Sequence, residues 1–143
     1  MVLLGGVRRD TNRIGEISES AIITRFLQLG YVVLIPYGGN QRYDLVIEDA
    51  GGHFWRIQCK TGRIDEESTA IRFSTSIRNV TGKNKQSRNY RGQCDYFAIY
   101  NETLNKVYLV PVDQVGTTSG VLRLTIRKNN QEKNTFWAKD YES

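Results

Sequence analysis

A change of periodicity at Gly30 constrains the fold of this chain more than any other feature. Before Gly30, apolar residues recur with helical spacing, which predicts a helix over residues 13–29 that starts near Asp10, Thr11 or Asn12. After it, the chain consists of short segments rich in β-branched and aromatic residues, which are typical of strands. One long helix followed by short strands predicts an α/β (α+β) fold, with a mixed central β-sheet flanked by helices.

Turn residues delimit the predicted strands. The first covers residues 31–35. The next two, residues 43–48 and 53–61, are joined by the turn Asp49-Ala50-Gly51-Gly52 and form a hairpin. Further strands are predicted over residues 69–76, 96–100, 106–110 and 122–127, while residues 79–93 form a loop or a short exposed helix. No repeat or linker divides the 143 residues, so we expect a single domain over residues 1–143.

Composition excludes several classes of protein. Cys59 and Cys94 make no disulfide framework, and with one histidine the chain lacks a zinc ligand set. The longest apolar run, residues 31–36, is far shorter than the ~20 residues of a membrane-spanning helix. Basic residues follow the N-terminal apolar stretch, which is not the order of a secretory signal. We therefore expect a cytoplasmic protein without a membrane partner.

Positive charge is concentrated in one segment. The net charge of +5 is weak evidence alone, but residues 78–91 contain no acid and are interleaved with Asn and Gln. This pattern suits phosphate contact and base-edge reading, which predicts a DNA-contacting insertion near residues 78–93. Its candidate residues are Arg78, Lys83, Lys85, Arg88, Tyr90 and Arg91. A solvated basic loop is the alternative, and Tyr90 could either stack on a base or anchor the loop.

A second group of cations is a further candidate for DNA contact. Strand alternation would place Arg123 and Arg127 on one face. Arg63 could contact a phosphate or pair with Asp65.

The hairpin carries the candidate chemistry. Gln58 and Lys60 share one face of the predicted strand, whereas Ile57 and Cys59 share the other, which we assign to the core. A tight turn would bring Asp44 alongside them. Oxygen ligands suit a hard divalent ion such as Mg²⁺ or Mn²⁺.

Each residue of this group has an expected role. Asp44, Gln58 and the backbone carbonyl of Cys59 are the candidate metal ligands, and Lys60 would position or deprotonate the attacking water. A polar hairpin face without any site is the alternative that these residues alone leave open.

Two sequence motifs resemble the PD-(D/E)XK nuclease superfamily. Arg42-Tyr43-Asp44 followed by Gln58-Cys59-Lys60 resembles its hairpin, and Gly15 and Glu19 resemble its first helix. Over nearly the whole chain the sequence is similar to the group I intron-encoded homing endonucleases of cyanobacteria. The resemblance implies a restriction-endonuclease-like core and adds Glu19 to the catalytic residues Asp44, Gln58 and Lys60.

The resemblance also implies a function and an assembly. The expected activity is site-specific hydrolysis of double-stranded DNA with a divalent metal, giving a double-strand break. One chain offers one active site, so cutting both strands implies a homo-oligomer, a dimer or a tetramer. Only one of Phe54 and Trp55 can face the core, which leaves the other for a subunit interface. A Holliday-junction resolvase of the same fold and an inert DNA-binding protein are the alternatives.

Gln58 departs from the superfamily pattern because an acid usually occupies its position. A neutral ligand should weaken metal binding by ~1–3 kcal/mol, the scale of a lost charge-assisted contact. Asp44, Lys60 and Glu19 are retained, which argues against a decayed site.

Overall fold

The computed structural model describes residues 4–77, 88–127, 129 and 135–143. The elements of this part of the chain are α1 (Thr11–Gln28), β1 (Val32–Leu34), β2 (Leu45–Glu48), β3 (Phe54–Thr61), β4 (Arg63–Ile64), β5 (Ala70–Ser74), β6 (Ser76–Ile77), β7 (Arg88–Asn89), β8 (Tyr96–Asn101), β9 (Lys106–Pro111), the 3-10 helix η1 (Val112–Gln114), β10 (Ser119–Arg123) and the 3-10 helix η2 (Ala138–Asp140).

Helix α1 lies where the sequence predicts it, but it begins two residues earlier and ends one residue earlier than the predicted range 13–29. The carboxylate of Asp10 accepts a hydrogen bond from the N–H of Arg13 at 2.8 Å and so caps the first turn. Beyond the last turn, Gly30 has a φ of +87°, which favours glycine. Ile22 and Phe26 are fully buried and pack α1 onto the sheet. No helix in the described ranges has the length and apolar character needed to cross a membrane.

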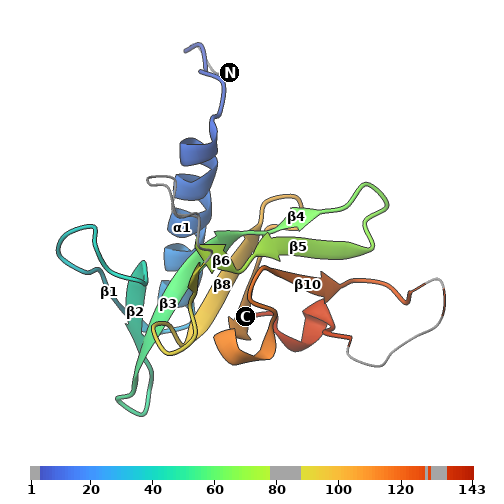
Figure 1. Cartoon of the computed structure of the whole chain (residues 1–143). Helices are drawn as coiled ribbons and strands as arrows, with labels where there is room; N and C mark the ends of the chain where they lie inside the picture. Colours follow the sequence, from blue (N-terminus) through green and yellow to red (C-terminus); the bar gives the residue numbers. More distant parts are fainter. Residues whose placement is uncertain (1–3, 78–87, 128, 130–134) are drawn as a thin grey trace, which may run out of the picture.

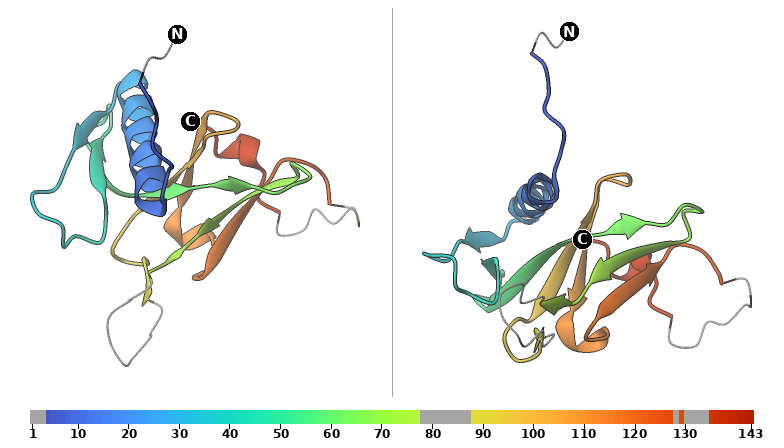
Figure 2. Two further views of the ribbon diagram at one scale, coloured as in Figure 1. Left: turned by 90° about the horizontal axis from the view of Figure 1, so that it is seen from above. Right: turned by 45° about the horizontal axis from the view of Figure 1, so that its top comes forward.

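The central sheet has five strands in the order β1-β2-β3-β8-β9 (Figures 1 and 2). Strands β3 and β8 are parallel, whereas the other neighbours are antiparallel. Helix α1 covers one face of this sheet through a cluster that includes Leu45, Ile57 and Ala98. The mixed sheet and its helix confirm the predicted α+β class.

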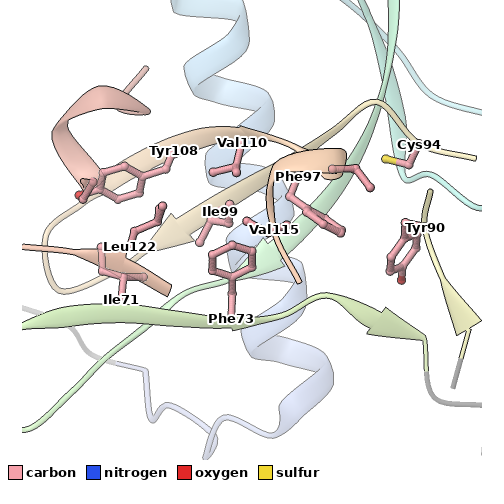
Figure 3. Packing of buried hydrophobic residues seen from close by; sticks show 12 residues of the cluster. Ile71, Phe73, Tyr90, Cys94, Phe97, Ile99, Tyr108, Val110, Val115 and Leu122 are labelled. Atoms are coloured by element: carbon pink, nitrogen blue, oxygen red, sulfur yellow. The ribbon is translucent and has the colours of Figure 1, made fainter. Parts of the chain in front are cut away.

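A second sheet, with the order β10-β5-β4, lies against the other face of the central sheet. Figure 3 shows the cluster between the two sheets, where Phe73 of β5 and Leu122 of β10 meet Phe97 and Ile99 of β8. One detail therefore differs from the prediction. Within the described residues the central sheet has an α-helix on one face, and on the other a small sheet with the short 3-10 helices η1 and η2 in place of an α-helix.

One predicted strand is misplaced. Residues 122–127 alternate in polarity, but β10 runs over Ser119–Arg123 because its partner β5 starts opposite Arg123, at Ala70. Gly120 lies under the ring of Phe73, where an added Cβ would clash. Glycine is therefore required at this position, although it is a weak strand former. The predicted strand over residues 69–76 is divided into β5 and β6. The strands predicted before residue 62 and over 96–110 are confirmed, with ends shifted by at most two residues.

Candidate active site

The hairpin of β2 and β3 fixes Asp44 beside the middle of β3. Asp44 directly precedes β2, and its N–H donates to the carbonyl of Ile57 at 2.9 Å. Its carboxylate Oδ2 accepts the N–H of Cys59 at 2.8 Å. Backbone and side chain are thus both bound to β3, as the hairpin spacing predicts.

Asp49 organises the turn that sets this register. Its Oδ1 accepts the N–H groups of Gly51 and His53, and its Oδ2 accepts the indole N–H of Trp55 at 2.9 Å. These bonds, that of Trp55 first, lower the pKa of Asp49 to about 2. The ionised turn carboxylate therefore holds the two strands in the register that positions Asp44.

Lys60 is half-buried between the two sheets. Its ammonium Nζ donates to the hydroxyl of Tyr90 at 3.4 Å and lies 4.8 Å from the centre of the Tyr90 ring. Burial lowers the pKa of Lys60, and the negative charge of Asp44 opposes that shift. An ammonium in such surroundings releases its proton more readily than a surface lysine.

Glu19 on α1 is coupled to Asp44. Burial raises the pKa of Glu19, and the negative charge of Asp44 raises it further. Ser18 is 3% exposed, and its hydroxyl lies 2.6 Å from that of Thr61 at the end of β3. This hydrogen bond, which was not predicted from the sequence, helps to hold α1 next to β3, the strand that carries Lys60. The sequence contained one indication of this contact. Ser18 lies four residues before Ile22, so it falls on the apolar face of the predicted helix, where a polar side chain needs a hydrogen-bond partner.

Gln58 and Cys59 point to opposite faces of β3, as alternation predicts. The Cys59 side chain packs in the cluster under α1, where burial raises the pKa of its thiol well above the ordinary value. Gln58 is half-buried beside Lys60, and its amide makes no hydrogen bond to any described residue. The face of Gln58 and Lys60 is not an open polar surface, because the second sheet covers part of it.

The oxygen atoms near Asp44 fit a divalent cation. Burial raises the pKa of Asp44 most, while the Cys59 N–H and Lys60 act against it. Burial thus disfavours the ionised forms of both Asp44 and Glu19. A cation bound between them would stabilise these ionised forms. Asp44 Oδ1 accepts no hydrogen bond from the described residues, and the amide oxygen of Gln58 is equally available. No three Asp, Glu, His or Cys side chains of the described ranges form a metal cluster, so a cation here would depend on Gln58, backbone or water oxygens.

The predicted DNA-contacting insertion lies mostly outside the described residues. This holds for Arg78, Lys83 and Lys85, and for the side chain of Arg88 in β7. Tyr90 is described and corrects one expectation. It is 7% exposed and packs edge-on against Phe97, with ring centres 5.4 Å apart. A ring enclosed in the core cannot stack on a base, so Tyr90 anchors this segment and is removed from the DNA contacts.

The other predicted DNA-contacting arginines are at the surface. Arg91 is exposed, and its guanidinium donates to the carbonyl of Val115 at 3.2 Å. Arg123 and Arg127 line one cavity of about 380 Å³. The prediction that strand alternation places Arg123 and Arg127 on one face is wrong, because β10 ends at Arg123 and Arg127 lies beyond the strand.

Comparisons with known proteins give a family and a related solved structure. Residues 9–143 match the protein family described as PD-(D/E)XK endonuclease. No curated protein matches the sequence. The solved structure of a bacterial homing endonuclease, I-Ssp6803I, is similar with a TM-score of 0.74 and 27% sequence identity, over 94% of this chain and 89% of that chain. The matched range spans the segments that carry the candidate site residues Glu19, Asp44, Gln58 and Lys60, whose roles remain a prediction.

Proposed function

Because the chain belongs to the PD-(D/E)XK endonuclease family, we propose that it is a site-specific DNA endonuclease of the intron-homing type. It hydrolyses phosphodiester bonds with a divalent metal and makes a double-strand break. The observation that carries the proposal is Asp44, held by the Cys59 N–H at 2.8 Å and electrostatically coupled to the half-buried Lys60. The similarity to a bacterial homing endonuclease supports the homing role.

The site residues divide the work of hydrolysis. Asp44, Gln58 and the carbonyl of Cys59 would hold Mg²⁺ or Mn²⁺, which when bound polarises the phosphate and acidifies a water. Lys60 attracts the scissile phosphate when protonated and, with its lowered pKa, accepts a proton from water when neutral. Glu19, whose pKa is raised, is a second carboxylate able to accept that proton.

The substrate in this proposal is double-stranded DNA, and the active form is a homo-oligomer. Each chain carries one set of these residues, so cleavage of both strands requires at least two copies, in a dimer or a tetramer.

A cleavage assay with two substrates tests the proposal. Wild type, Lys60→Ala and Lys106→Ala are incubated with Mg²⁺ and either a duplex library or a synthetic four-way junction. Lys106 is the control because it lies on the same central sheet but is exposed and paired with Glu142. We expect discrete duplex products from wild type and Lys106→Ala, and a rate lower by ~10²–10⁴-fold in Lys60→Ala.

Two outcomes would contradict the proposal. Cleavage of the junction alone would indicate a resolvase. DNA binding without cleavage in any divalent metal would exclude both enzymatic functions and leave a DNA-binding protein.

A further inference from the structure

Two arginines stand opposite each other on the outward face of the second sheet. Arg63 of β4 pairs in register with Arg72 of β5, and both side chains are exposed. Like charges directly opposite on neighbouring strands destabilise the pair. Neither guanidinium forms an ion pair with any residue in the described ranges. Hydrogen bonds from Thr69 to both carboxylate oxygens are the main cause of the lowered pKa of Asp65, and the charge of Arg72 adds least to that shift.

The same face continues onto β10 with short polar side chains. Ser74 lies two residues from Arg72, so it shares that face, and it pairs with the exposed Ser119. Val121 pairs with Arg72, which places Arg123 on this face as well. Guanidinium groups and hydroxyls together can bind phosphate oxygens and base edges.

A cleft of about 690 Å³ joins this face to Lys60. Arg63 and Arg72 line one side, and Thr11 and Gly15 from the start of α1 line another. Figure 2 shows β4 and β5 passing the N-terminal end of α1. Gly15 leaves room in the cleft, since an added Cβ would meet no atom within 4 Å. A row of phosphates that reaches Lys60 along this cleft passes both arginines.

We propose that the outward face of β4, β5 and β10 is a DNA-contacting surface, on which Arg63 and Arg72 bind phosphates next to the scissile bond. The planar guanidinium matches a phosphate with two parallel hydrogen bonds. A phosphate placed between the two arginines also removes the repulsion present in the free chain. The inference rests on the proposed nuclease function and adds a surface separate from residues 78–91.

Salt-dependent binding of a labelled duplex tests this surface. Anisotropy of a fluorescein-labelled DNA duplex of random sequence is measured in EDTA for wild type, Arg63→Gln, Arg72→Gln and Lys106→Gln. Each arginine variant should bind about tenfold more weakly at low salt. Its slope of log affinity against log salt should be smaller by about 1, the share of one phosphate contact. Lys106→Gln loses the same charge beyond the cleft and should match wild type.

Thermal unfolding separates lost contacts from lost structure. Both arginine variants should melt at or above the wild-type temperature, because each relieves a like-charge pair.

Arginine variants that bind the duplex like Lys106→Gln would overturn the assignment of this face, while duplex binding and cleavage by the wild type would still support the nuclease. A wild type that binds no duplex would contradict both. An RNA duplex of the same sequence is the last arm. Tighter binding of that RNA, lost in the same variants, would assign the face to RNA and overturn the DNA surface.

Discussion

At the scale of single residues, Asp44 connects the members of the candidate site. Burial raises the pKa of Glu19 and lowers that of Lys60; the charge of Asp44 adds to the first shift and opposes the second. One of its oxygens is fixed by the N–H of Cys59. Neutralising Asp44 would therefore change the pKa values of both Glu19 and Lys60.

The raised pKa of Asp44 predicts a dependence of stability on pH. Folding disfavours the ionised form of Asp44, so its protonated form contributes to the free energy of unfolding. This contribution is fully present below the ordinary carboxyl pKa of ~3.9 and is lost as pH rises through the pKa of Asp44 in the folded protein. Asp44→Asn keeps an oxygen for the Cys59 N–H and removes the charge. In EDTA at neutral pH its urea midpoint should exceed that of wild type, and the difference should shrink in acid. A difference independent of pH would contradict this account.

Gln58 predicts a change in metal affinity. Gln58→Glu adds the negative charge missing from the ligand set and should tighten Mn²⁺ binding by ~1–3 kcal/mol, measured by isothermal titration calorimetry. Gln28→Glu, the same change on the exposed end of α1, should leave affinity unaltered. If both variants bound Mn²⁺ like wild type, Gln58 would not be a ligand.

Between the elements α1 and β3, the hydrogen bond of Ser18 with Thr61 adds to the apolar packing of the helix on the sheet. Ser18→Ala leaves the hydroxyl of Thr61 without this partner and should lower the free energy of unfolding by about 1–2 kcal/mol. Ser20→Ala is the control, because among the described residues its exposed hydroxyl bonds only to the carbonyl of Ile17 within α1. Equal denaturant midpoints for the two variants would show that the contact with Thr61 contributes no stability.

Local signals predicted the elements whose partners are near in sequence. The Asp10 cap and Gly30 bounded α1, and the Asp49 turn gave the hairpin and with it the place of Asp44. The second sheet was missed because β5 and β10 are separated by more than 40 residues. Its register depends on the Gly120 contact with Phe73, which no local pattern encodes.

The same limit applies to the residues around the site. Tyr90 reads equally well as a base-stacking or an anchoring residue until its contact with Phe97 is known. The Arg63–Arg72 pair also depends on register between strands, so spacing along the chain could not reveal it.

In the molecule as a whole, the central sheet exposes two apolar side chains near its edge strand, one on either side of Glu48. Val32 of β1 and Phe54 of β3 both align with Glu48, so they share one face, and they are 55% and 59% exposed. Trp55 is instead packed edge-on against Tyr96, which makes Phe54 the aromatic residue left for a subunit interface.

This surface predicts the effect of a charge on assembly. Phe54→Arg should shift the sedimentation of the protein toward the monomer and reduce double-strand cleavage more than nicking. Ile126→Arg introduces the same charge at a residue that is 58% exposed and should sediment like wild type. A Phe54→Arg protein that retains the wild-type assembly would exclude this face as the interface.

Whether Asp44 is essential for DNA cleavage is tested most directly by the single-turnover rate of duplex cleavage in Mg²⁺ by Asp44→Asn. The substitution keeps the shape of the side chain and an acceptor for the Cys59 N–H, but it removes the negative charge and one of the two candidate ligand oxygens. We expect discrete duplex products from wild type and a rate at least ~10²-fold lower in Asp44→Asn, with the fold intact. Cleavage by Asp44→Asn at the wild-type rate would contradict this expectation.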